Sequence, residues 1–371
     1  MTKFVASEAS APGKVILFGE HAVVYGIPAV AASVSSLRVS TRVTFGGEPV
    51  VGVALENLKS EKDGEPLRRS WPSNKVKEIV PNDAVFLPRP SPSLTAALTN
   101  FLKDEHPKDA NALRPALFLL LAIVPQVLDE STGVELTVQS GDFPVGAGLG
   151  SSAAFSVSVA AALLRCREES VSLDTINSYA FAGEVLLHDD PSGVDNSVAT
   201  YGGALVYRKN PKSLETFSMP KLRILLTNTH VPRETKVLVN HVRSLHTADP
   251  VTVEGHFSTI EELAKTFQQQ VQSNSLSESD LANMMATNQA CLDALEVGHQ
   301  SITTICEMSA KYTMVTKLTG AGGGGCTITL VPADATDDDI ALLKYELTQE
   351  GFTCIETALG GPGVEFHQVE E

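Results

Sequence analysis

The sequence predicts an α+β protein of two units, and three observations lead to this fold class. The chain has 371 residues, which is enough for two domains that each bury a hydrophobic core. Stretches that alternate apolar and polar residues, as strands do, are interspersed with apolar stretches of helical length. Pro, Lys and Ser cluster at residues 210–220 and mark a boundary. We therefore expect a first domain at residues 1–215 and a second at residues 216–371.

The first unit is organised around one strand and one helix. Residues Gly133–Gln139 alternate apolar and polar side chains at the period of a strand. Residues 153–164 are apolar or small, contain no Gly or Pro, and predict a buried helix. Residues 56–92 are rich in charged residues, Pro and Ser, so we expect a loop-rich lid or insertion there. The other expected elements are strands at 15–18, 28–34 and 38–45, and a glycine turn followed by a strand within 201–207. Helices are expected at 94–101, 113–128, where Pro125 can kink the helix, and 173–187.

The second unit is also expected to mix strands and helices. Three or four helices are predicted across residues 233–311, and a further helix at Asp337–Gln349. The expected strands lie at 223–227, 313–318, 326–331 and 352–357.

Charge and cysteine content argue against several classes of function. The formal net charge of −16 disfavours general binding to nucleic acid or anionic membranes, because a basic surface is missing. The five cysteines are scattered without a CxxC pair, as in a reduced cytosolic protein. Residues 1–10 lack the apolar core of a signal peptide, and the longest apolar runs fall short of the ~20 residues of a membrane span. We expect a soluble protein of the cytoplasm.

Between the strand and the helix of the first unit lies the segment PVGAGLGSS, residues 144–152. Glycines let the backbone approach an anion closely, and a helix N-terminus offers unpaired N–H groups and the positive end of its dipole. A strand, a glycine loop and a helix start therefore predict a phosphate-binding loop. The residues expected to bind the phosphates are Gly146, Ala147, Gly148, Leu149, Gly150, Ser151 and Ser152.

Two better-known phosphate loops do not fit this segment. A Walker A loop needs a lysine after its last glycine, and none follows Gly150. A Rossmann loop reads GxGxxG and has a ribose-binding acid at the end of a second strand. Here the segment reads GxGxG, and Glu168 and Glu169 lie just past the helix. A tight strand-to-helix turn without a ligand remains the alternative.

Several acidic and hydroxyl side chains have the chemistry that phosphoryl transfer needs. A serine at the start of a phosphate-loop helix, here Ser152, suits Mg²⁺, with helix capping as the alternative. Glu184 lies late in a predicted helix, where the dipole disfavours a carboxylate and a bound cation would offset that cost. Asp195 lies in a Gly-Val-Asp-Asn turn and can accept a proton from a hydroxyl. Asp189 and Asp190 are more simply explained by turn formation and solvation.

Lys14 precedes the first apolar strand, and Glu20 and His21 lie at its far end. Taken alone, such a lysine is more often a solvated charge, and such a histidine can be a hydrogen-bonded core residue. The sequence contains no HExxH or other zinc-binding spacing, which argues against a zinc site.

A second glycine stretch, GAGGGG at residues 320–325, lies between two predicted strands. Such a run is costly unless the backbone must pack closely against something. We expect a second backbone clamp on the phosphates, with Gly322 and Gly323 among its residues. A plain glycine hairpin is the alternative.

Three stretches together resemble the motifs of the GHMP family of small-molecule kinases. They are APGKVILFGEHAVVYG at 11–26, PVGAGLGSSAA at 144–154 and KLTGAGGGGC at 317–326. They occur in the family's order and span nearly the whole chain, so jointly they are specific.

Within the family, three segments are most similar to the members that phosphorylate mevalonate. They read GEHAVVYG, DDPSGVDN at 189–196 and TNTHVPR at 227–233. The second departs from the usual pattern at Asp189 and Asp190, where Gly and Asn are more common. This departure leaves the backbone shape of the turn open.

The resemblance implies an N-terminal domain like the second domain of ribosomal protein S5 and a C-terminal ferredoxin-like α/β domain. ATP and substrate would lie in the cleft between them. The implied reaction moves the γ-phosphoryl group of ATP to the 5-hydroxyl of (R)-mevalonate. The resemblance also implies a homodimer and feedback inhibition by farnesyl-type diphosphates that compete at the nucleotide site.

Matched residue by residue, the resemblance makes Asp195 the catalytic base and Lys14 its cationic neighbour. Ser152 and Glu184 would hold Mg²⁺. In this arrangement Lys14 keeps the carboxylate charged and helps to orient the alcohol. Glycine backbone and metal would screen the triphosphate.

The resemblance also suggests residues that contact the two substrates. Glu20 and His21 would line the mevalonate pocket, and Arg233 is a candidate cation for the substrate carboxylate. Residues 56–92 match the family poorly, and the adenine contact expected there is Asn57.

Two alternative functions remain. Another GHMP kinase, phosphomevalonate kinase or homoserine kinase, would phosphorylate a different alcohol. A catalytically silent protein would sense the same ligands, although the presence of Lys14, Glu184 and Asp195 together favours catalysis.

Overall fold

The computed structural model describes residues 4–87, 89–129, 132–141, 143–144, 147–167, 170–232 and 234–369. Its strands are β1 Ser7–Phe18, β2 Ala29–Gly46, β3 Val50–Lys59, β4 Pro66–Pro72, β5 Gly133–Gln139, β6 Ala204–Arg208, β7 Ser213–Phe217, β8 Leu222–Asn228, β9 Val315–Leu318, β10 Cys326–Leu330, β11 Thr353–Leu359 and β12 Glu365–His367. Its helices are α1 Ser73–Lys77, α2 Pro92–Phe101, α3 Pro107–Ile123, α4 Ser151–Arg165, α5 Leu173–His188, α6 Val194–Tyr201, α7 Thr235–Ala248, α8 Pro250–Gln272, α9 Glu278–Ala294, α10 Gln300–Ala310 and α11 Asp337–Gln349. Two 3₁₀ helices lie at η1 Ala22–Tyr25 and η2 Pro125–Asp129.

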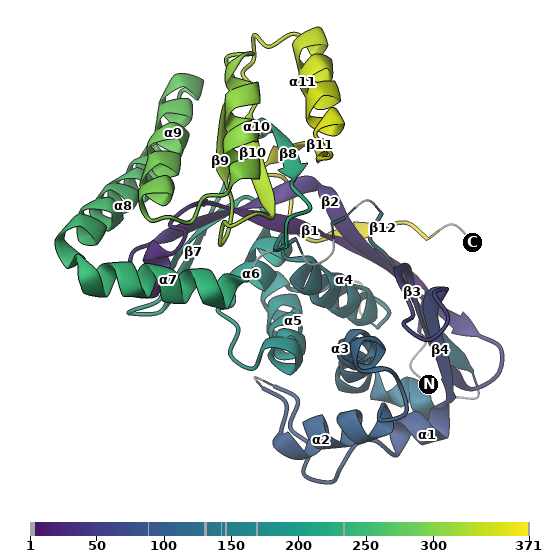
Figure 1. Ribbon diagram of the computed structural model, residues 1–371. Coiled ribbons are helices and arrows are strands. Elements are labelled where there is room, and N and C mark those ends of the chain that lie inside the picture. The colour runs from purple at the N-terminus through teal and green to yellow at the C-terminus, as the bar shows by residue number, and fades with distance from the viewer. Residues whose placement is uncertain are drawn as a thin grey trace.

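One sheet runs through both halves of the molecule. Its main path has the order β4-β3-β5-β2-β11-β8-β10-β9, and β1, β6, β7 and β12 join it at the sides. Strand β2 links the halves, because it pairs with β1, β5 and β6 and, at Val34↔Leu359, with β11. Figure 1 shows β1 and β2 crossing the centre, with α2 to α6 below them and α9 to α11 above.

Helix α4 is the centre of the first hydrophobic core. Its Val157, Val159 and Leu163 side chains are fully buried, with β1 and β2 on one side and α3, α5 and α6 around the rest. Gly183 of α5 lets α5 approach α4, because a Cβ there would lie 3.3 Å from the Ser156 hydroxyl oxygen. This contact brings the following residue of α5, Glu184, beside the first turns of α4.

The second core contains a piece of the N-terminal half. Ala22 and Tyr25 of η1 pack among apolar side chains of α7, α8 and α9. The Tyr25 ring lies 4.7 Å from the Phe257 ring and 4.9 Å from the His246 ring, measured between centroids. Burial of aromatic area at this contact fixes the segment that follows Glu20 and His21 against the C-terminal half.

The structure confirms many of the predicted elements. Strand β5 and helix α11 have the predicted bounds, and four helices, α7 to α10, occupy the described residues 234–311, where three or four were expected. The strands expected at 28–34 and 38–45 form the single strand β2. Residues 35–37 between them bulge out of the β1–β2 ladder opposite Pro12 and Gly13.

Three predictions about the fold are corrected. The lid expected at 56–92 is wrong for its first half, because β3 and β4 form an antiparallel hairpin from Val50↔Pro72 to Leu55↔Leu67, followed by α1. Arg68 pairs with Glu56 on the exposed face of this hairpin, whereas Arg69 points to the other face and pairs with Glu105 and the buried Asp109. Helix α3 starts earlier than predicted and ends before Pro125, which lacks the N–H that a helix would need. Strand β7 was missed, because its stretch resembles a linker.

The division at 215/216 stays a prediction, and it cuts β7. Strand β7 pairs with β6 from Arg208↔Ser213 to Ala204↔Phe217. A division at residues 218–221 would keep this hairpin in the first unit. The chain end also returns to the first half, where β12 pairs with β1. Within the described ranges, no helix is both long enough and apolar enough to cross a bilayer.

Candidate active site

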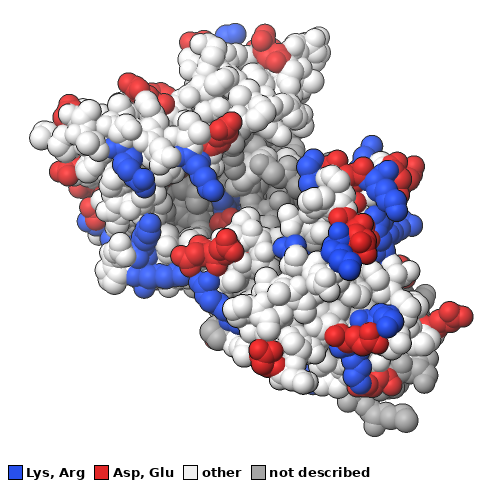
Figure 2. Space-filling view, turned by 60° about the horizontal axis from the view of Figure 1, so that its bottom comes forward, with Lys and Arg blue, Asp and Glu red and all other residues white. Residues whose placement is uncertain are grey.

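A lysine–aspartate pair lies where β1, the glycine loop and α6 meet. The Lys14 ammonium nitrogen is 3.4 Å from Asp195 Oδ1 and donates a 3.1 Å hydrogen bond to the carbonyl oxygen of Gly148. The backbone N–H of Lys14 donates to the carbonyl oxygen of Leu149 at 2.7 Å. These bonds tie β1 to the loop. Figure 2 shows the surface hollowed between the two halves, with side chains of both charges around the hollow.

Asp195 owes its position to the start of α6. Gly193 is the N-cap of this helix, with φ 86°, a left-handed conformation that glycine adopts at little steric cost. Asp195 follows in the first turn, where the helix dipole favours a negative charge. Its side chain is 40% exposed and that of Lys14 is 11% exposed. The carboxylate is therefore held by a cation and still accessible to a ligand.

Glu184 is a second carboxylate near the start of α4, and it is buried. It accepts hydrogen bonds from the hydroxyls of Ser152 at 3.0 Å and Ser156 at 2.9 Å. Burial raises the pKa of Glu184 to about 7; the two hydroxyl bonds oppose this rise, and the negative charge of Asp195 adds to it. His188 Nε2 lies 3.7 Å from the same carboxylate and 3.3 Å from the Ser152 oxygen.

The two serines of the glycine loop do not cap the helix. Gly150 is the N-cap of α4, with φ 76° and no capping bond from a side chain. A Cβ at Gly150 would lie 3.1 Å from Lys14 Cγ and 3.6 Å from Asp195 Oδ2. Glycine is therefore required here both for conformation and for space. The Ser152 hydroxyl points to Glu184 and His188, so the capping alternative does not describe this side chain.

The remaining residues of the glycine loop can offer a ligand mainly backbone groups, not side chains. Leu149 is buried in the core, so only its peptide groups can face a ligand. The Ala147 N–H donates to the Pro144 carbonyl oxygen at 3.4 Å. Gly148 has φ 73°, again in the left-handed region. Gly146, also predicted to bind phosphate, lies outside the described residues.

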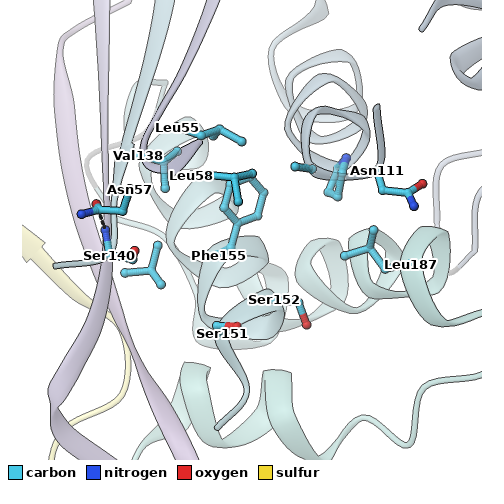
Figure 3. A pocket seen from close by; sticks show the side chains of 13 residues that line it. Leu55, Asn57, Leu58, Asn111, Val138, Ser140, Ser151, Ser152, Phe155 and Leu187 are labelled. Atoms are coloured by element: carbon cyan, nitrogen blue, oxygen red, sulfur yellow. Dashed lines mark hydrogen bonds between the residues drawn. The ribbon is translucent and has the colours of Figure 1, made fainter. Parts of the chain in front are cut away.

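An apolar pocket of ≈ 180 Å³ adjoins the loop (Figure 3). Its lining residues are Val39, Leu55, Asn57, Leu58, Asn111, Ala112, Pro115, Val138, Ser140, Ser151, Ser152, Phe155 and Leu187. Asn57 is fixed at one side, because its Oδ1 accepts a 2.7 Å hydrogen bond from the Ser140 N–H. The walls suit a flat apolar group, and the serines open one side to the glycine loop.

Glu20 and His21 face the C-terminal half. Glu20 forms a fully buried ion pair with Lys317 and accepts a 3.1 Å hydrogen bond from Asn288 Nδ2. His21 Nε2 lies 2.7 Å from the Ala321 carbonyl oxygen, and its Nδ1 is buried with no partner among the described residues. Burial lowers the pKa of His21. The bonds of Glu20 run to the protein interior and do not reach the Lys14–Asp195 pair.

The second glycine loop is packed tightly within the protein. Gly323 N–H donates to the Val297 carbonyl oxygen at 2.9 Å, and a Cβ at Gly322 would lie 2.1 Å from that oxygen. Thr319, just before the loop, bonds to both the N–H and the carbonyl oxygen of Ile16 at 2.9 Å. Close packing thus accounts for these two glycines, and the predicted clamp on phosphates stays a prediction. Arg233 lies outside the described residues.

Sequence reasoning missed several residues of this region. Ser156 and His188 contact Glu184, and Lys317 and Asn288 contact Glu20. Only Lys317 carried a signal in the sequence, since it begins the third motif.

The Asp189–Asp190 turn also has a partner that the sequence did not predict. Arg89 donates to the Asp189 carbonyl oxygen and pairs with the Asp190 carboxylate, both at 2.8 Å.

Comparison with known proteins gives consistent results. The family descriptions GHMP kinases N terminal domain and GHMP kinases C terminal match residues 115–203 and 261–351. The mevalonate kinase of Bos taurus is 38% identical, and that of Mus musculus 37%, each over 96% of this chain and 94% of the relative. The crystal structure of L. major mevalonate kinase in complex with R-mevalonate superposes with a TM-score of 0.73 at 20% identity, covering 98% of both chains. This chain therefore belongs to the GHMP kinase family and, within it, to the group of the mevalonate kinases.

Proposed function

We propose that this protein transfers the γ-phosphoryl group of ATP to the 5-hydroxyl of (R)-mevalonate, and that it supplies 5-phosphomevalonate for isoprenoid and sterol synthesis. Full-length similarity to mevalonate kinases supports the substrate, and membership of the GHMP kinases implies ATP as the donor. The observation that carries the proposal is the Lys14–Asp195 pair beside the glycine loop, in which the carboxylate is partly exposed. Phosphoryl transfer needs mainly positioning and charge stabilisation, and these groups supply both.

In this proposal Asp195 is the base that accepts the proton of the 5-hydroxyl. Its partial exposure leaves one side of the carboxylate for the alcohol, while Lys14 holds the other side. Lys14 orients the alcohol or the carboxylate and offsets charge on the transferred phosphoryl group. Its bond to the Gly148 carbonyl oxygen keeps it at the edge of the phosphate loop.

ATP is proposed to bind across the loop and the apolar pocket. The phosphates lie at Gly146, Ala147, Gly148, Leu149, Gly150, Ser151 and Ser152, with Gly322 and Gly323 closing from the other half. The adenine occupies the pocket beside Asn57. Support comes from the helix N-terminus at Gly150, whose N-cap residue has no side chain to cover it, and from an apolar cavity lined by Ser151 and Ser152 of the same helix.

Mg²⁺ is proposed to bind at Ser152 and Glu184. On nucleotides this ion takes one or two protein carboxylates and keeps phosphate and water oxygens as its other ligands. The donor set fits, because a hydroxyl and a buried carboxylate lie 3.0 Å apart and a cation there would offset the burial of Glu184. When bound, the ion neutralises phosphate charge; Ser152 and Glu184 contribute the protein oxygens that orient it.

Glu20, His21 and Arg233 are proposed to surround mevalonate. The buried Nδ1 of His21, which has no partner in the described part of the chain, supports a hydrogen bond to the substrate. The buried ion pair between Glu20 and Lys317 holds the adjacent His21 in place. Arg233 follows directly on the 227–232 segment, which packs on the second glycine loop through Thr229 and Gly325.

Three further features belong to this proposal. Farnesyl-type diphosphates inhibit by competing with ATP, since an apolar pocket beside a phosphate loop suits a prenyl chain joined to a diphosphate. The protein forms a homodimer, as the family resemblance implies. It acts in the cytoplasm on a small molecule, without nucleic acid or membrane, in keeping with its acidic charge and its five cysteines scattered along the sequence.

The direct test is ADP release by purified protein with Mg-ATP and a panel of alcohols. We expect turnover with (R)-mevalonate and at least tenfold lower kcat/KM with 5-phosphomevalonate and homoserine, as a site built around one substrate gives. Preferred turnover of phosphomevalonate or homoserine would replace the proposed substrate. Binding of ATP and mevalonate without turnover would identify a silent sensor.

A further inference from the structure

The turn at residues 189–193 joins the helix that carries Glu184 to the helix that carries Asp195. Its first residue, Asp189, has φ 54° and ψ −60°. The Asp190 N–H donates to the His188 carbonyl oxygen at 2.6 Å, which closes a γ-turn of the rare type with positive φ. This conformation is strained for a residue with a Cβ, so other contacts must hold it.

Arg89 supplies two of these contacts from a connection far away in the sequence. It lies between α1 and α2, 100 residues before Asp189. Nη1 donates to the Asp189 carbonyl oxygen, and Nη2 pairs with Asp190 Oδ1, both at 2.8 Å. The planar guanidinium thus fixes a backbone oxygen and a side chain of the turn at once, which a lysine could not do with the same geometry.

Phe181 of α5 holds Arg89 and the other end of the turn. The Arg89 guanidinium carbon lies 5.6 Å from the centroid of the Phe181 ring, and the Lys212 ammonium lies 5.7 Å from it. A Cβ on Gly193, the N-cap of α6, would lie 3.7 Å from the same ring and 3.6 Å from Leu214. One aromatic ring therefore supports Arg89 at the start of the turn and lies beside the last residue of the turn.

We infer that Arg89, stacked on Phe181, is a positioning residue for phosphoryl transfer, which fixes the 189–193 turn and thereby the separation of Glu184 and Asp195. This inference rests on the proposed function, because it assigns those two carboxylates to the metal and the alcohol. The contacts act on geometry more than on stability. Arg89 is 45% exposed and Asp190 90% exposed, and ion pairs at such exposure add little to folding.

The test compares Arg89→Ala with a matched control, Arg223→Ala. Arg223 is 43% exposed, pairs with Asp337 and Glu356, and lies at the end of β8 away from the second glycine loop. We expect Arg89→Ala to lower kcat roughly tenfold, because loss of alignment slows transfer between bound reactants. KM for ATP should stay within about twofold of wild type, since ground-state binding is unchanged. The control should leave both constants unchanged.

A second substitution distinguishes positioning from general damage. Glycine adopts φ 54° at little steric cost, so Asp189→Gly added to Arg89→Ala should restore most of the lost kcat. Circular dichroism and thermal unfolding of each variant measure folding separately. A kcat for Arg89→Ala within about twofold of wild type would overturn the inference. The inference would also be overturned if adding Asp189→Gly did not restore the kcat lost in Arg89→Ala. The same holds if the fall in kcat matched the fall in the fraction of folded protein.

Failure of the inference can be told apart from failure of the proposed function. If wild type turns over mevalonate and Asp195→Asn abolishes turnover while Arg89→Ala does not change it, the function stands and the positioning role is wrong. If wild type does not phosphorylate mevalonate, the proposed function fails first, and the role of Arg89 falls with it.

Discussion

Two lysine–carboxylate pairs of the same chemistry lie in very different surroundings. Lys14 and Asp195 meet at 3.4 Å with side chains 11% and 40% exposed. Lys317 and Glu20 meet with both side chains fully buried. The first pair joins a strand to a helix start beside the hollow between the halves, and the second joins the η1 segment to β9.

The two pairs differ in whether their charged groups have further hydrogen-bond partners within the protein. The Lys317 ammonium also donates to the Leu318 carbonyl oxygen at 2.6 Å, and Glu20 also accepts from Asn288, so both members of the buried pair have further partners inside the protein. Burial lowers the pKa of Lys317, and the charge of Glu20 opposes this. The Asp195 carboxylate keeps an exposed side. We therefore expect the buried pair to hold the segment with Glu20 and His21 in place, and the open pair, Lys14–Asp195, to take part in the reaction itself. The predictions below test this difference.

The largest effect is expected from breaking the buried pair on one side only. Lys317→Met leaves the Glu20 charge buried without a counter-charge, so the free energy of unfolding should fall by about 3–5 kcal/mol. Urea unfolding followed by circular dichroism measures it. The double variant Lys317→Met/Glu20→Gln should recover part of the loss. Unchanged stability of the single variant would show that the pair does not hold the halves together.

The corresponding change in the open pair is Lys14→Met, which should lower kcat and leave the stability of the fold nearly unchanged. Loss of a cation beside the reacting groups is expected to lower kcat roughly 10²-fold. Because Asp195 is 40% exposed and stays solvated without its partner, the free energy of unfolding should change by no more than about 1 kcal/mol. A Lys14→Met protein that loses as much stability as Lys317→Met would remove the contrast between the two pairs.

The pH dependence of the Mg²⁺ requirement tests whether Glu184 is a metal ligand. Its pKa of about 7 means that the carboxylate is largely protonated below pH 7, so Mg²⁺ must displace a proton there. The concentration of Mg²⁺ at half-maximal rate should rise roughly tenfold per pH unit below 7 and level off above it. Initial rates at pH 6 and pH 8 measure this. A Mg²⁺ requirement that is the same at both pH values would argue against Glu184 as a ligand.

The same group makes a prediction for stability, in the opposite direction to a typical carboxylate. The folded pKa is raised above the ordinary value of 4.5, so between pH 4.5 and about 7 the folded state binds more protons than the unfolded state. The contribution of Glu184 to stability is therefore present at low pH and is lost as pH rises through 7. Glu184→Gln should flatten this part of the pH–stability curve, and an unaltered curve would contradict the raised pKa.

The smallest effect is expected from the loop serine. Ser152→Ala should raise the Mg²⁺ or ATP requirement severalfold, as the loss of one oxygen ligand does. Ser156→Ala is the matched control, because its hydroxyl bonds the same carboxylate at 2.9 Å but is fully buried. Equal metal titrations for Ser152→Ala and wild type would leave Ser152 without a metal role.

Local patterns predicted much of the fold. Strand β5 and helix α4 follow from alternation and from an unbroken apolar run, and the glycine loop between them follows from its composition. The β3–β4 hairpin was not predicted, because charged residues lie on both faces of β4 and interrupt the alternation: Arg68 pairs with Glu56 and the next residue, Arg69, with Glu105. Strand β7 was also missed, because it lies within residues 210–220, where clustered Pro, Lys and Ser resemble a linker.

The site could be predicted only in part, for a physical reason. The pairing of Lys14 with Asp195 was identified through motif resemblance, since nothing in local spacing brings residues so distant together. The Lys317–Glu20 pair and the Arg89 contact depend on tertiary packing between segments without a local pattern. The apolar pocket was missed as well, because its walls come from β2, β3, β5, α3, α4 and α5 at once. Residue periodicity reports which face is buried, not which distant group lies opposite.

The measurement that tests the central claim most directly is the turnover of Asp195→Asn with saturating Mg-ATP and (R)-mevalonate. This variant keeps the shape of the side chain and removes its ability to accept the proton. We expect kcat to fall by roughly 10²-fold or more, with binding of ATP and thermal stability unchanged. Turnover near that of wild type would show that Asp195 is not the base and would contradict the account of the open pair.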